Sequence, residues 1–178
     1  MELRGFGSRQ LGRFFAVPTR SYEADGIIVH WDAERCVHSA VCLRSLPGVF
    51  DLDQRPWVDL EAATPDEVAA LIETCPSGAL RYERTDGTAG EQAPETTTVI
   101  PWPNGPLIVR GSLTVQDRRG GVFDAGPRFA LCRCGASENQ PFCDMSHLRV
   151  EFRNNPRAVD DRAAARNPGD LSPDPGLA

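Results

Sequence analysis

The stretch Leu131–Leu148, LCRCGASENQPFCDMSHL, determines how the second half of this 178-residue chain can fold. It holds three of the six cysteines and one of the three histidines, with the spacing C-x-C-x8-C-x3-H. The four candidate metal ligands are Cys132, Cys134, Cys143 and His147. If residues 143–147 are helical, Cys143 and His147 share one face, because positions i and i+4 are neighbours on a helix. The pattern therefore predicts a metal-ligand site, in which a helical last stretch would bring Cys143 and His147 together.

Three thiolates with one imidazole suit either a tetrahedral zinc ion or an iron–sulfur cluster, and spacing alone does not separate the two. Disulfide bonds are the weakest alternative. We find no secretory signal pattern and expect a cytoplasmic protein, in which thiols stay reduced. The formal net charge of −6 gives no support to a nucleic-acid partner. No apolar run reaches the ~18 residues that a membrane span requires.

The same stretch resembles the CDGSH iron–sulfur domain, the mitoNEET-type fold, whose pattern is C-x-C-x2-(S/T)-x3-P-x-C-D-G-(S/A/T)-H. The matching residues are Cys132, Cys134, Ser137, Pro141, Cys143, Asp144, Ser146 and His147. The resemblance implies a [2Fe-2S] cluster with Cys132, Cys134, Cys143 and His147 as ligands. Met145 stands where the family has glycine. If that position needs a positive φ, methionine costs stability there; if it is helical, methionine is tolerated and shields the cluster.

The remaining cysteines, Cys36, Cys42 and Cys75, form a second group with the spacing C-x5-C and a distant C-P pair. Bacterial ferredoxin motifs use C-x2-C-x2-C with a remote C-P pair, so this chain lacks the middle cysteine. Three thiolates fit a [3Fe-4S] cluster, or a [4Fe-4S] cluster whose fourth iron takes a different ligand. His38 and Ser39 are the local candidates for that ligand. Ser39 occupies the place of the missing cysteine, whereas His38 is the better donor.

Residues 30–84 resemble the divergent single-cluster 4Fe-4S domain, which often precedes a CDGSH motif in bacterial chains. The matching residues are Trp31-Asp32, Cys36-Val37-His38-Ser39, Cys42, Leu46-Pro47, Val49-Phe50, Arg55-Pro56-Trp57 and Cys75-Pro76-Ser77-Gly78-Ala79-Leu80. The resemblance implies an iron–sulfur cluster held by Cys36, Cys42 and Cys75. We expect Trp31 and Trp57 to be core residues or to cover that site.

The first half of the chain has the pattern strand, ligand loop, helix and strand. The β-branched residues of Gly26–Trp31 predict the first strand, and Ala79–Arg84 supplies the closing one. Thr64 is expected to cap a helix, with Pro65 in its first turn and Glu67 completing a capping box. The apolar face of this helix consists of Val68, Leu71, Ile72 and Cys75, at positions i, i+3, i+4 and i+7.

The second half is β-rich, with a turn at Arg118–Gly121. Its expected strands are Leu107–Arg110, Ser112–Gln116, Phe129–Leu131 and Val150–Phe152. The apolar core of this half is small, so we expect a bound cluster to hold much of its fold together. The predicted fold class is α+β: a small ferredoxin-like α+β domain followed by a β-rich CDGSH cluster-binding domain. The predicted boundaries are 1–20 for a mobile extension, 21–85 for the 3Fe-4S/4Fe-4S domain, 86–99 for a linker, 100–153 for the [2Fe-2S] domain and 154–178 for a disordered tail.

No Ser-His-Asp order, Gly-rich phosphate loop or paired carboxylates indicate an active site, so we expect no enzyme. The sequence favours an iron–sulfur protein that carries two clusters and acts in one-electron transfer. Cluster storage or transfer, redox sensing and a zinc-stabilised interaction module are the alternatives. The expected partner is a redox protein or an apo cluster acceptor, and a homodimer through the second domain is a further prediction. An acidic surface could steer a basic partner; its residues are Asp51, Asp53, Asp59, Glu61, Asp66 and Glu67.

Overall fold

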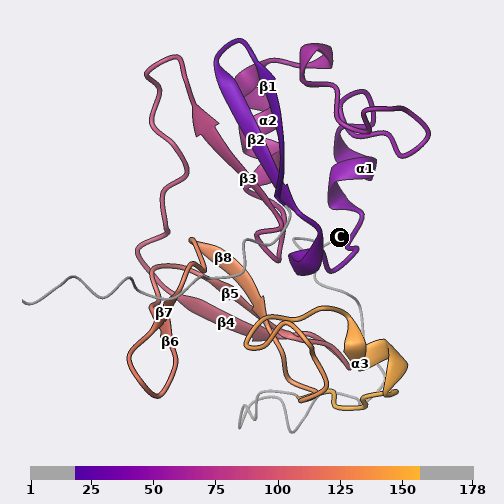
Figure 1. Ribbon diagram of the computed structural model, residues 1–178, viewed down its shortest axis with the longest axis vertical. Coiled ribbons are helices and arrows are strands. Elements are labelled where there is room, and N and C mark those ends of the chain that lie inside the picture. Colours follow the sequence, from indigo (N-terminus) through magenta and orange to yellow (C-terminus); the bar gives the residue numbers. More distant parts are fainter. Residues whose placement is uncertain (1–18, 157–178) are drawn as a thin grey trace, which may run out of the picture.

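The computed structural model describes residues 19–156, which form two units in contact (Figure 1). The first unit is a three-stranded sheet with helices, and the second consists mostly of strands and loops, so the predicted α+β class is confirmed. The predicted extension and tail lie outside the described residues, except for Thr19, Arg20 and residues 154–156. Within residues 19–156, no helix is long and apolar enough to cross a membrane.

The first sheet is antiparallel and has the order β1-β2-β3. Its strands are β1 (Thr19–Ala24), β2 (Ile27–Asp32) and β3 (Leu80–Arg84). β2 and β3 lie where the sequence predicts them, whereas β1 has no counterpart in the prediction and includes the last two residues of the predicted extension. Its sequence, TRSYEA, lacks a regular apolar alternation, and its conformation comes from pairing with β2. In this register Tyr22 lies opposite Val29.

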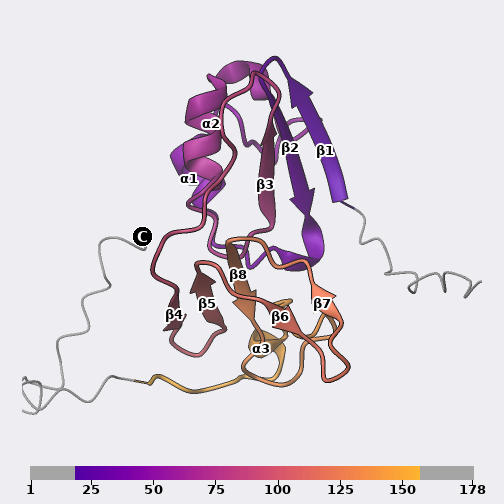
Figure 2. The ribbon, with the colours of Figure 1, turned by 90° about the vertical axis from the view of Figure 1, so that its left-hand side faces the viewer.

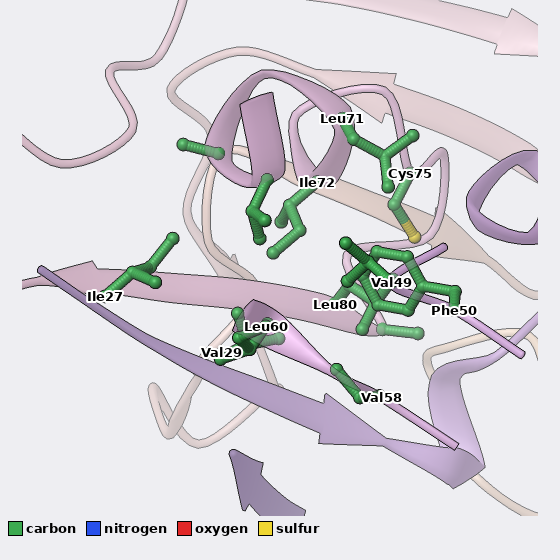
Figure 3. Close-up of a cluster of buried hydrophobic side chains, with 13 residues drawn as sticks. Ile27, Val29, Val49, Phe50, Val58, Leu60, Leu71, Ile72, Cys75 and Leu80 are labelled. Carbon is green, nitrogen blue, oxygen red and sulfur yellow. The ribbon is translucent and has the colours of Figure 1, made fainter. Parts of the chain in front are cut away.

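Helix α2 (Pro65–Ile72) lies against one face of this sheet (Figure 2). It starts with the predicted capping box: the Thr64 hydroxyl accepts from the Glu67 N–H at 3.3 Å, and the Glu67 carboxylate accepts from the Thr64 N–H at 2.9 Å. The bond from the Thr64 backbone lowers the pKa of Glu67. The predicted apolar face is buried in full, at Val68, Leu71, Ile72 and Cys75. These residues belong to the main core of the first unit (Figure 3).

The chain between β2 and α2 is built from short turns that place two of the cysteines. Its elements are the 3₁₀ turn Ala33–Arg35, the helix α1 (Val41–Ser45) and the 3₁₀ turn Leu60–Ala62. The Asp32 carboxylate accepts from the N–H groups of Glu34 and Arg35 at 3.0 and 3.3 Å, which starts the first turn directly after β2. Cys36 therefore follows a capped turn, and Cys42 lies in α1.

The second unit contains the antiparallel sheet β4-β5-β8 and the two-stranded sheet β6-β7. Its elements are β4 (Thr98–Pro101), β5 (Leu107–Arg110), β6 (Val115–Gln116), β7 (Val122–Phe123), β8 (Arg128–Leu131) and α3 (Ser146–Arg149). β5 and β8 match the prediction, and β4 starts inside the predicted linker. The strand predicted at Ser112–Gln116 shortens to β6.

The predicted final strand, Val150–Phe152, is wrong. Val150 and Glu151 form a turn after α3, and Glu151 has a positive φ of 50°. A residue in the left-handed region turns the chain out of the extended conformation that strand pairing needs. The Phe152 N–H donates instead to the His147 carbonyl at 2.9 Å, so this segment closes the end of α3.

Candidate metal centres

The motif at residues 131–148 is a loop closed by its own backbone hydrogen bonds. β8 ends at Leu131, and the Cys132 N–H then donates to the Pro141 carbonyl at 2.8 Å. On the returning half of the loop, the Cys143 N–H donates to the Ala130 carbonyl at 2.9 Å. These two bonds bring the C-x-C half of the motif beside the half that contains Cys143.

The four predicted ligands of this loop lie as two pairs. The sulfurs of Cys132 and Cys134 are 3.8 Å apart, and the Cys143 sulfur is 3.5 Å from His147 Nδ1. Two thiolates on one tetrahedral metal, each bonded at about 2.3 Å, are separated by roughly 3.8 Å. Each pair therefore has the spacing of two ligands on one metal ion, and a donor set in two pairs fits a cluster with two irons. Across residues 19–156, no three His, Cys, Asp or Glu side chains are grouped around a single metal position.

Cys143 and His147 lie together, as expected, but not through a shared helical face. α3 begins only at Ser146, and the residue before it, Met145, is left-handed with φ 71° and ψ 4°. This turn, and not a shared helical face, brings the Cys143 sulfur to the His147 ring. Position 145 therefore has the positive φ under which methionine costs stability.

Burial favours the neutral forms of two of the predicted ligands, Cys143 and His147. It raises the pKa of the Cys143 thiol and lowers the pKa of the His147 imidazole, which is 7% exposed. At Asp144, burial opposes ionisation, but hydrogen bonds from the N–H groups of Ser146 and Glu138 outweigh it and lower the pKa. A neutral imidazole can bind a metal directly, whereas a buried thiol releases its proton when the metal binds.

The cysteines of the first unit converge on one cavity of about 30 Å³. Cys36 comes from the turn after β2, Cys42 from α1 and Cys75 from the segment after α2, so three separate segments build the site. Burial raises the pKa of the Cys36 and Cys42 thiols. Cys36 and Cys42 also line an adjacent groove of about 850 Å³, which opens the site to the surface.

Both predicted candidates for a fourth ligand, His38 and Ser39, line the small cavity. His38 is left-handed, with φ 49°, and its Nδ1 lies 3.9 Å from the Cys36 sulfur. Ser77 has no place in the predicted ligand set, yet it is 2% exposed and its hydroxyl lies 3.8 Å from the Cys75 sulfur. Its position two residues after Cys75, in the C-P-S-G turn, is the sequence signal that could have identified it.

Trp31 and Trp57 cover this site, as predicted. Both line the cavity, and their rings pack edge to face with centroids 5.0 Å apart. Against the effect of burial, a hydrogen bond from Trp31 lowers the pKa of the Cys36 thiol. The Trp57 indole N–H is buried without an acceptor in the described part of the chain. A buried donor without a partner costs about 1–3 kcal/mol, and the sulfur of a bound cluster would supply the acceptor. The chemistry of the lining therefore fits such a cluster, which would occupy the cavity together with part of the adjacent groove.

Two sulfur-rich sites on a small α+β scaffold define an iron–sulfur cluster-binding protein. Residues 22–85 match the family described as "Divergent 4Fe-4S mono-cluster", and residues 104–148 match "Iron-binding zinc finger CDGSH type". The chain is 36% identical over 63 residues to the "Uncharacterized protein YjdI" of Escherichia coli K12 and to its counterpart in strain O157:H7. The aligned region covers 35% of this chain and 83% of each relative. The chain therefore belongs to the divergent 4Fe-4S mono-cluster family, with a CDGSH iron-binding domain after it.

Proposed function

We propose that this protein holds two iron–sulfur clusters at once and acts as a carrier in one-electron transfer, not as an enzyme. The main support is that one folded chain gathers two separate sulfur-rich donor sets, each with half-buried or buried thiols. Cys132, Cys134, Cys143 and His147 would hold a [2Fe-2S] cluster. Cys36, Cys42 and Cys75 would hold a [4Fe-4S] or [3Fe-4S] cluster. Such clusters supply a centre that takes up and releases one electron.

The two donor sets would hold their clusters at different reduction potentials. His147 contributes a neutral imidazole in place of a thiolate, which removes negative charge and raises the potential, as in Rieske centres. Backbone N–H groups also point at the sulfurs of this site: Ala136 at Cys134, at 3.4 Å, and Met145 at Cys143, at 3.5 Å. Such bonds stabilise the more negative, reduced state. The backbone N–H groups of His38 and Leu43 bond the sulfurs of Cys36 and Cys42 in the same way, so the imidazole makes the difference between the two sites. We therefore expect the first site to have the lower potential.

The groove beside the first site supports electron exchange with an external redox protein. Cys36 and Cys42 line it, so a cluster held there would lie near the surface. The acidic residues of the first unit are mostly exposed but lie outside the groove, whose own charged lining residues are Arg20 and Arg55. A basic partner would therefore be steered by the surface around the groove and not by its lining. Electron delivery through such a surface should slow as the salt concentration rises, because salt screens exposed charges.

Within this proposal, His38 is the best candidate for the fourth ligand of a [4Fe-4S] cluster, because it lines the same cavity as the three cysteines and its imidazole is a better donor than the Ser39 hydroxyl. His38→Ala should then lose one iron from the first site and show the signal of an oxidised three-iron cluster in the protein as isolated. The matched control is His30→Ala, since the His30 ring bonds to Ser21 and Glu83 on the sheet. A His38→Ala protein with an unchanged four-iron cluster would exclude His38 as a ligand.

The deciding experiment measures iron, zinc and acid-labile sulfide per chain on anaerobically purified protein, with electron paramagnetic resonance (EPR) spectra before and after dithionite. The proposal expects about five or six irons per chain, from a two-iron cluster and a three- or four-iron cluster, and reversible one-electron reduction. About two irons would confine redox chemistry to residues 132–147. Zinc without sulfide would instead support an interaction module. Rapid passage of the cluster to an apo acceptor, faster than any electron exchange, would favour cluster transfer.

A further inference from the structure

Val37 belongs to the ligand loop of the first site but is buried in the second unit. It follows Cys36 directly and is 4% exposed. It lies in one apolar cluster with Cys143, Ile108 and Ala130, all residues of the second unit. The side chain next to a ligand of the first site therefore packs in the same cluster as a ligand of the second site.

Arg35, on the other side of Cys36, makes the same connection. Its guanidinium lies 4.0 Å from the centre of the Phe142 ring, a cation–π distance. It also donates to the Asp124 carbonyl at 2.6 Å. Phe142 precedes Cys143 in the chain, so the neighbours of one cysteine on each site are in contact across the boundary between the units.

The segment of Cys75, the third cysteine of the first site, is also fixed by the second unit. Arg128 of β8 is 3% exposed and donates to the carbonyls of Cys75 and Leu80 at 2.6 and 3.1 Å. The Glu91 carboxylate accepts two further bonds from the same guanidinium, at 2.5 and 2.8 Å, and balances its buried charge. Gly78 approaches so closely that an added Cβ would lie 2.2 Å from the Arg128 carbonyl oxygen. The two sites are thus held at one fixed separation.

From these contacts we infer that Val37, together with the Arg35–Phe142 contact, forms an internal path that carries one electron from the first site to the second within a single chain. The inference rests on the proposed function. In this step the cluster of the first site is oxidised by one electron and that of the second is reduced by one; no bond is made or broken. An external one-electron donor protein supplies the electron, and an external one-electron acceptor protein removes it. Tunnelling through packed atoms is faster than through a gap, which is why the buried valine matters.

The test begins with wild-type protein in which both clusters are present and reduced. Two paramagnetic centres at a fixed short separation split or broaden each other's EPR signals and speed up their relaxation. We expect such an interaction on the signal of the second site. Its absence, in protein with full iron content and two reducible centres, would overturn the internal path and leave the proposed function standing. Missing clusters or irreversible reduction would instead overturn the proposed function.

The variant that tests Val37 is Val37→Ala, and its matched control is Val68→Ala. Both valines are buried, but Val68 lies in α2, in the separate core of the first unit, and lines neither the cavity nor the groove of the first site. Rapid mixing with less than one equivalent of reductant would follow the electron from the first site to the second. We expect a slower internal transfer in Val37→Ala, with unchanged midpoint potentials, and the wild-type rate in Val68→Ala. Equal rates of internal transfer in the two variants would contradict the path through Val37. If Val37→Ala does not fold, the EPR interaction in the wild-type protein is the test of the internal path.

Discussion

The two units of this protein bury apolar surface in different ways. In the first unit, thirteen buried residues form one continuous cluster between the sheet and α2. In the second unit the buried residues divide into two clusters of four, and one of these four-residue clusters includes Val37, which the first unit supplies. The first unit therefore has a core of its own, whereas the second, with little helix and short strands, depends on its ligand loop. Metal binding and folding should be coupled far more strongly in the second unit.

Removal of iron should separate the stabilities of the two units more than any other change. After chelation under reducing conditions, we expect β4, β5 and β8 to lose protection from hydrogen exchange, while β1, β2 and β3 keep it. The loss corresponds to the whole folding free energy of a small unit, on the order of 5 kcal/mol. Mass spectrometry of the exchanged protein would measure it strand by strand. Equal loss in both sheets would show that the first core does not fold independently of the clusters.

A change inside the main core should be the next largest effect. Ile72 is fully buried on α2, so Ile72→Ala should destabilise the metal-free protein by about 2–5 kcal/mol, through lost transfer energy and the cavity left behind. Leu52, which is 58% exposed in the same unit, provides the control, since Leu52→Ala should change stability by less than about 0.5 kcal/mol. Urea denaturation followed by circular dichroism would compare them. Similar midpoints for the two variants would contradict a single dominant core.

The buried indole of Trp57 should have a smaller effect, on the first site alone. Trp57→Phe removes the N–H that lacks an acceptor among residues 19–156, and so removes a donor to the cluster sulfur. The reduced cluster should lose about 1 kcal/mol of stabilisation, so we expect the reduction potential of the first site to fall by roughly 40 mV. Trp102→Phe, the same change beside the second site, should leave the first potential unaltered. A redox titration that shows no shift for Trp57→Phe would mean that its N–H bonds elsewhere.

The elements that the sequence predicts best are those specified by local chemistry. The capping box of Thr64 and Glu67 needs only residues three apart, and the apolar face of α2 needs only its own spacing. The cysteine groups likewise follow from short motifs. By contrast, β1 takes its conformation from a partner strand, and nothing in TRSYEA reveals it.

The features that sequence reasoning missed depend on contacts between distant segments. In the sequence Val37 is an ordinary loop residue, and only the structure shows that the second unit buries it. The carbonyl of Cys75 meets Arg128 across 53 positions of the chain. A sequence motif identifies the candidate ligands of each site, but it does not show that the two ligand loops pack against each other.

Met145 offers the smallest test of the comparison, because the left-handed turn of the ligand loop and the departure from the family glycine occur at this one residue. Its left-handed φ of 71° costs a side chain with a Cβ about 1–2 kcal/mol. Met145→Gly should therefore be more stable than Met145→Ala by about 1 kcal/mol, since both lose the thioether packing and only glycine relieves the backbone. At exposed Leu148 in α3 the order should reverse, with alanine better than glycine by about 1 kcal/mol. Urea denaturation of the loaded protein, followed by cluster absorbance, would rank the four variants. If alanine were the better residue at both positions, the left-handed turn would not be the source of strain in this loop.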